Sequence, residues 1–148
     1  MTTELLRERL PELDTATLAP LLNVLPAARR EALVFAALQG VERLAARNPV
    51  VRLLQAYAEP WSARLTRLFV DRLCDEVGRR DVPFGPTMEF GWLTSAALRW
   101  DPALVDEAAP RLRTAARQPG GWVNWLHTLE RALALWAFRR ELHEELSR

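Results

Sequence analysis

Runs of helix-favouring residues fill almost every interval between the prolines and glycines of this chain, and this pattern constrains the fold more than any other feature. Alanine, leucine, arginine and glutamate dominate these runs, and they are among the residues with the highest helix propensity. No segment reads as a credible strand, which would need apolar and polar residues in strict alternation. The sequence therefore predicts an all-α protein.

Capping residues predict where the helices of the first half begin. The side chains of Asp14, Asn48 and Ser62 are each placed to accept a hydrogen bond from a free backbone N–H group at a helix start. Pro20 is expected to kink or restart the second helix, and Gly40 is a point at which the third can break. The expected helices cover about residues 4–10, 15–25, 26–47, 49–58 and 62–77.

The second half begins with a clear interruption. Two prolines and a glycine in "DVPFGP" exclude a helix there, and Thr87 is expected to cap the next one. Asp101 followed by Pro102 is a strong helix start, and Pro110 is expected to kink or divide the helix that follows. The turn "QPGG" precedes the longest helix. The expected helices cover about residues 87–100, 101–117 and 122–148.

Short breaks between consecutive helices imply antiparallel neighbours. We therefore expect stacked antiparallel helical hairpins, about six to eight helices, in a single all-helical domain over residues 1–148. Segments 14–20 and 101–110 both combine an acidic cap, a small apolar run and a proline inside the helix, as HEAT-like solenoids often do. The repeat signal is faint, so a HEAT-like solenoid fragment and an irregular helical bundle both fit.

The composition argues for a cytoplasmic protein and against nucleic acid as a partner. Cys74 is the only cysteine, so no intrachain disulfide can form and a reducing compartment is expected. Acids and arginines occupy the N-terminus where a signal peptide needs an apolar run, and no apolar segment reaches the roughly 18 residues of a membrane span. The 20 basic residues, all arginine, nearly balance 19 acidic ones, far from the basic excess that phosphate binding demands.

Two apolar stripes run along the expected last helix. The first stripe combines spacings of three and four residues and consists of Trp122, Trp125 or Leu126, Leu129, Leu133 and Trp136. The second stripe begins where the first ends, lies on another side of the helix, and consists of Leu135, Phe138, Leu142 and Leu146. An aromatic cage needs several rings around one cavity, which a single helix does not provide. Stripes at helical spacing are ordinarily packing surfaces, so a core is expected here.

The sequence contains no pattern of residues that predicts a metal site, a catalytic site or a phosphate-binding loop. His127 and His143 lie sixteen positions apart on one helix, so they cannot both reach one metal ion. Cys74 is in a helix interior, which does not activate a thiol. Gly120 and Gly121 lack the preceding strand and the following lysine of a phosphate loop. We therefore expect no enzymatic activity and no cofactor.

Residues 60–148 resemble the C-terminal region of a bacterial family of helical-repeat, HEAT-like proteins of unknown function, encoded near MoxR-type AAA ATPases and von Willebrand factor A-domain proteins. The resemblance is carried by "PWSARLTRLFVDRL" at 60–73, "RWDPALVDEAAPRL" at 99–112 and the closing "ALWAFRRELHEEL". It implies a scaffold or adaptor that works beside an AAA ATPase chaperone system. No catalytic residue is implied.

The leading hypothesis is therefore a non-enzymatic helical scaffold that binds another protein, an AAA ATPase or a von Willebrand factor A-domain protein among the candidates. Tryptophan and arginine often dominate such contacts, and the candidate anchors are the exposed members of Trp61, Phe84, Trp92 and Trp100, with Arg139 and Arg140. The alternative is a small-molecule or cofactor-binding domain with a pocket between the last helix and residues 83–100. A deep apolar cavity with inward polar groups would favour that alternative.

Overall fold

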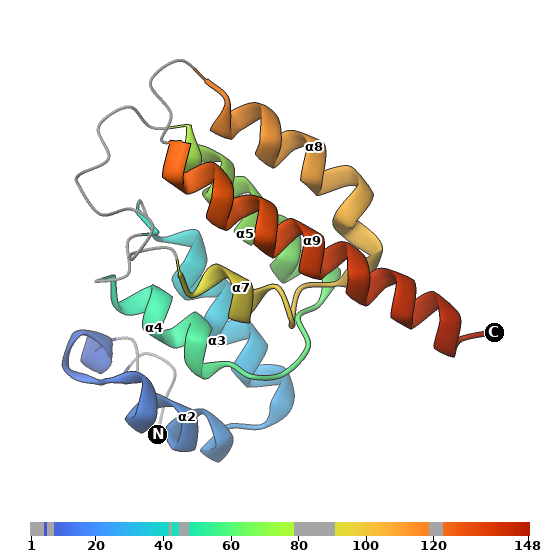
Figure 1. Cartoon of the computed structure of the whole chain (residues 1–148). Coiled ribbons are helices and arrows are strands. Elements are labelled where there is room, and N and C mark those ends of the chain that lie inside the picture. Colours follow the sequence, from blue (N-terminus) through green and yellow to red (C-terminus); the bar gives the residue numbers. More distant parts are fainter. Residues whose placement is uncertain (1–4, 6–7, 42, 45–47, 79–90, 119–122) are drawn as a thin grey trace. The chain divides into compact units, whose positions relative to one another are not determined.

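The computed structural model describes residues 5, 8–41, 43, 44, 48–78, 91–118 and 123–148, without the side chains of 123–125. This part of the chain contains seven α-helices, two short 3-10 helices and no strand (Figure 1). The prediction of an all-α fold with six to eight helices is confirmed. The chain divides into two compact units, which we call unit 1 (Met1–Glu59) and unit 2 (Pro60–Arg148). The single domain and the HEAT-like stacking stay predictions.

Unit 1 contains η1 (Leu10–Glu12), α2 (Thr15–Val24), α3 (Ala27–Gln39) and α4 (Pro49–Ala56). Helix α4 packs against η1, α2 and α3, and the side chains buried between these elements include Leu18, Leu33 and Val51. Arg52 of α4 also donates a hydrogen bond to the carbonyl oxygen of Leu13, at 3.0 Å. Apolar contacts around α4 therefore hold this unit together.

Polar side chains cap three helices at the predicted positions. Side-chain oxygens of Asp14, Asn48 and Ser62 accept backbone N–H groups at 2.8, 2.8 and 3.1 Å, which satisfies donors left free at a helix start. Pro20 lies inside α2 without dividing it. Gly40 ends α3, as its prediction as a break point allowed, and residues 41, 43 and 44 are not helical; residues 42 and 45–47 lie outside the described residues.

Unit 2 contains α5 (Ala63–Val77), α7 (Leu93–Ala96), η2 (Pro102–Leu104), α8 (Val105–Ala116) and α9 (Val123–Leu146). Helix α5 packs against η2 and α8, and α9 packs against α7, η2 and α8. Pro110 lies inside α8 without dividing it. A helix was predicted over residues 87–100. Within the described part of this segment, residues 91–100, only α7 is α-helical, and turns lie on both sides of it. Residues 87–90 lie outside the described residues.

Ion pairs join neighbouring helices of unit 2. Arg111 of α8 bonds Asp71 of α5 at 2.8 Å. Arg113 of α8 makes two hydrogen bonds to Glu130 of α9, at 2.9 and 3.1 Å. All four side chains are substantially exposed, and exposed pairs contribute at most about 1 kcal/mol each. They therefore orient helices that apolar packing already holds together.

The last turns of α9 extend past α5, α7 and α8 (Figure 1). Beyond Trp136 no described side chain of α9 is buried, and residues 141–148 are all exposed. The helix therefore leaves the packed part of unit 2 near Arg140.

Candidate functional site

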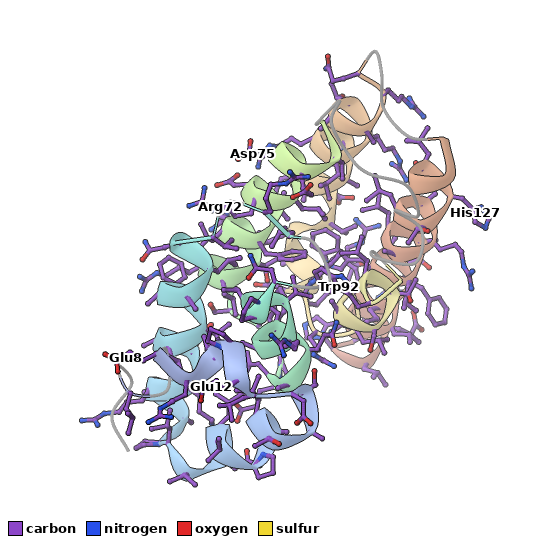
Figure 2. All side chains as sticks on the ribbon, turned by 90° about the vertical axis from the view of Figure 1, so that its left-hand side faces the viewer. Glu8, Glu12, Arg72, Asp75, Trp92 and His127 are labelled. Carbon is purple, nitrogen blue, oxygen red and sulfur yellow. The ribbon has the colours of Figure 1, made fainter. Side chains whose placement is uncertain are left out.

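Aromatic rings from α5, α9 and the segments beside them pack together in unit 2. Phe69 of α5 lies 5.2, 5.8 and 5.3 Å from Trp61, Trp92 and Trp100, measured between ring centroids. Trp100 lies 4.9 Å from Trp136 of α9 in an edge-to-face contact. Figure 2 shows Trp92 among the interior side chains. Edge-to-face contacts stabilise such a cluster beyond the burial of its area, so these rings form a core.

Two of the candidate anchors belong to that core. Trp61 is 3% exposed and Trp100 is 0% exposed, because both rings pack against Phe69. A partner cannot reach them on the surface of unit 2, so Trp61 and Trp100 are not among the exposed members of the candidate set. Trp92 is half-buried, with its indole nitrogen buried. Phe84 lies outside the described residues.

The two candidate arginines are engaged inside unit 2. Arg139 donates hydrogen bonds to the carbonyl oxygens of Ala97 and Trp100, at 2.6 and 2.9 Å, and burial lowers its pKa. Arg140 forms an ion pair with Asp106 at the start of α8. These side chains fasten the turn after α7 and the start of α8 to α9. A partner that used them would first have to break these bonds, so they are not free anchors.

The first apolar stripe predicted on α9 is buried. Leu129, Leu133 and Trp136 are at most 1% exposed, and Trp136 also donates its indole N–H to the carbonyl oxygen of Asp101, at 2.9 Å. The interpretation of these residues as core is confirmed. The side chains of Trp122 and Trp125 lie outside the described part of the chain.

The second stripe, by contrast, is exposed beyond Leu135, which is half-buried. Phe138, Leu142 and Leu146 are 55%, 46% and 85% exposed; we call these three residues the α9 face. Each helical residue turns by about 100°, so the α9 face lies on average about 150° around the helix axis from the buried stripe. Leu98, in the turn that Arg139 fastens to α9, is 52% exposed as well. The sequence did not distinguish this apolar surface from the buried stripe, because both stripes have the spacing of packing surfaces.

An acidic border runs along the α9 face. Glu141 and Glu145 follow Phe138 and Leu142 by three residues each, and residues at this spacing are neighbours on a helix. Both carboxylates are exposed. Glu145 has a distant contact with Arg148 at 3.8 Å, and Glu141 forms no ion pair within the described residues. The exposed apolar strip is therefore accompanied by negative charge.

A surface hollow of about 460 Å³ lies between α5 and α8, lined by Cys74, Pro110, Arg111, Thr114, Ala115 and Gln118. Burial raises the pKa of the Cys74 thiol, which disfavours the reactive thiolate. Arg111 is already bonded to Asp71. This hollow is not the pocket expected between the last helix and residues 83–100. Residues 83–90 lie outside the described residues, so that alternative stays a prediction.

The histidines of α9 lie on its surface. His127 is exposed and points outward in Figure 2, and His143 is exposed on the extended part of the helix. Within the described residues, no group of three or more His, Cys, Asp and Glu side chains is arranged to hold a metal ion. The described helices also include none with the length and apolar character needed to cross a membrane.

Comparison with protein-family models gives a match along almost the whole chain. The model of a family of unknown function, DUF5691, matches residues 1–146. The chain belongs to this family. No curated protein and no solved structure matches it. The expected membership in a family of unknown function is thus supported, while the genomic neighbourhood and the helical-repeat character of the family stay predictions.

Proposed function

We propose that this DUF5691 chain is a non-enzymatic helical adaptor that binds another protein, and that the α9 face is its contact surface. The α9 face carries the proposal, because three large apolar side chains lie exposed in a row on a helix that extends from its unit. Contiguous exposed apolar surface often marks a protein interaction site, and aromatic residues are enriched in interface cores.

The other candidate anchors are already buried or bonded inside unit 2, and this supports the choice of the α9 face as the contact surface. Trp61 and Trp100 hold the core, and Arg139 and Arg140 fasten neighbouring segments. The α9 face makes no comparable contribution to unit 2, since all three of its side chains are exposed. A partner can therefore cover the α9 face without disturbing the packing of the unit.

The resemblance to proteins encoded near MoxR-type AAA ATPases makes such an ATPase, or a von Willebrand factor A-domain protein, the first partner to test. We place this interaction in the cytoplasm. Within the proposal, the chain contributes a docking surface, and any nucleotide chemistry belongs to the partner.

Site-specific photocrosslinking tests the proposal. A photoreactive phenylalanine analogue replaces Phe138 in the full chain, and a matched control places it at Thr114, an exposed residue of α8. In cells that express the chain naturally, one protein should be captured from position 138 and not from position 114. Co-purification of that protein with the wild-type chain, and its loss with Phe138→Glu, would then identify the contact. Capture of the same proteins from both positions would contradict the proposal.

A further inference from the structure

The chemistry of the α9 face also indicates what kind of partner it binds. We infer that the α9 face takes an amphipathic helix whose apolar stripe is flanked by basic side chains. This inference rests on the proposed function and specifies the partner for the same surface. It follows from the spacing of the apolar side chains, from the charge beside them and from the hydrogen bonds that already engage the nearby arginines.

The spacing of the α9 face suits a helix as partner. Phe138, Leu142 and Leu146 follow one another at intervals of four residues, which makes a straight row along one side of the helix. The row is about 12 Å long, since each residue advances a helix by about 1.5 Å. A partner helix with apolar residues at intervals of three and four covers such a row by placing its side chains between those of α9.

The charge beside the row favours a basic partner. Glu141 and Glu145 border Phe138 and Leu142 on one side, and both are exposed. Arg139, which directly follows Phe138, is committed to two carbonyl oxygens, and Arg148 makes one long contact with Glu145, at 3.8 Å. Arginine or lysine side chains on a partner helix would therefore compete only with Arg148 for Glu145, and with no ion pair of the described residues for Glu141. Charge complementarity of this kind selects partners and speeds association.

The same charges disfavour a second copy of this chain as the occupant. In an antiparallel two-fold contact, each border of one helix meets the same border of the other copy. Such a contact through the α9 face brings Glu141 and Glu145 against their equivalents. Carboxylates set against carboxylates repel each other, and this repulsion excludes wrong partners.

Binding of designed peptides to the full chain tests the inference. The probe is a labelled synthetic helix of about 18 residues, or about five turns, with a leucine stripe and arginine flanks. One control peptide has the same composition without a stripe, and a second has glutamate flanks. Fluorescence anisotropy at about 50 and 300 mM salt measures each affinity and its dependence on screening. The arginine-flanked peptide should bind at least about tenfold more tightly than either control.

Variants of the chain locate the binding. Phe138→Ser with Leu142→Ser should weaken binding by about tenfold or more, with an unchanged circular dichroism spectrum because both side chains are exposed. Glu141→Gln with Glu145→Gln should weaken it at low salt and reduce its salt dependence. Val24→Ser, which changes an apolar residue of α2 that is 68% exposed, is the matched control and should change neither.

Three results would overturn the inference. The first is equal binding of the striped and unstriped peptides, and the second is full binding by Phe138→Ser with Leu142→Ser. The third is a dimer in analytical ultracentrifugation that the same two changes abolish, since the occupant would then be a second copy. Failure of the peptide alongside specific crosslinking from position 138 would refute the basic helix and leave the proposed adaptor function standing.

Discussion

Replacing Trp136 by phenylalanine should destabilise unit 2 more than the same replacement at Trp100. The two residues form a matched pair, since both side chains are 0% exposed and their rings are in contact. They differ in the indole N–H group. The Trp136 group donates to the carbonyl oxygen of Asp101 at 2.9 Å, whereas the Trp100 nitrogen is buried with no hydrogen-bond partner among the described residues.

The size of the difference follows from the hydrogen bond. Trp136→Phe loses a buried bond, which costs about 1 kcal/mol, and leaves the Asp101 carbonyl without this donor. Trp100→Phe removes an unpaired donor whose desolvation already costs about 1 kcal/mol or more, so part of its packing loss is offset. Both changes remove the same atoms from a side chain that is 0% exposed, so we take their packing losses as equal. Trp136→Phe should therefore be the less stable variant by about 2 kcal/mol, or about thirtyfold in the unfolding constant.

Urea unfolding followed by circular dichroism at the helix band measures the free energy of unfolding of both variants. Amide hydrogen exchange in α8 and α9 assigns the change to unit 2. Equal losses of stability, within about 0.5 kcal/mol, would show that the indole hydrogen bond does not distinguish the two positions. A larger loss at Trp100 would refute the reasoning outright.

Three further predictions concern single side chains. Ser62→Ala removes the cap of α5 and should lower the free energy of urea unfolding by about 1 kcal/mol, whereas Ser62→Gly should cost only a few tenths; equal losses would contradict the capping role. The hydrogen bond from Arg113 lowers the pKa of Glu130 below the ordinary value of a glutamate, so the stabilisation that this bond gives is present above the unfolded pKa and is lost as pH falls through the folded pKa. Between pH values of about 7 and 3, Glu130→Gln should therefore lose about 0.5 kcal/mol less stability than the wild type, a small difference because the pair is exposed. Since burial raises the pKa of the Cys74 thiol, iodoacetamide at a pH of about 8 should alkylate the folded chain more slowly than free cysteine, and urea should remove this protection; an equal rate for the folded chain would disprove it.

Local signals in the sequence were sufficient to place most helices. Asp14, Asn48 and Ser62 cap helices as predicted, because a cap depends on residues only two or three positions away. Pro20 and Pro110 were predicted either to kink or to divide their helices, and the division is excluded because α2 and α8 continue through them. Packing against neighbouring helices can hold a helix through a proline, and that packing is not a local property.

The candidate anchors were harder to assess, because burial depends on residues far away in the chain. Trp61 precedes α5 outside any helical stripe, yet its backbone N–H bonds the carbonyl oxygen of Arg99 and its ring packs on Phe69. In the sequence, Arg139 and Arg140 are two adjacent arginines of a kind that is usually exposed. The carbonyl oxygens that accept hydrogen bonds from Arg139, those of Ala97 and Trp100, lie about forty positions earlier in the chain. No periodicity or motif reports such contacts.

Helix lengths, by contrast, contain information that the stripes alone do not. Helix α9 has 24 residues and its neighbour α8 has 12, so at about 1.5 Å per residue α8 can lie beside only half of α9. The sequence already indicates this difference, since the two helices predicted there cover about residues 101–117 and 122–148. A long last helix beside a short neighbour therefore predicts an uncovered end. Apolar residues kept at helical spacing on such an end, as at Phe138 and Leu142, are better explained by a partner than by the chain's own core.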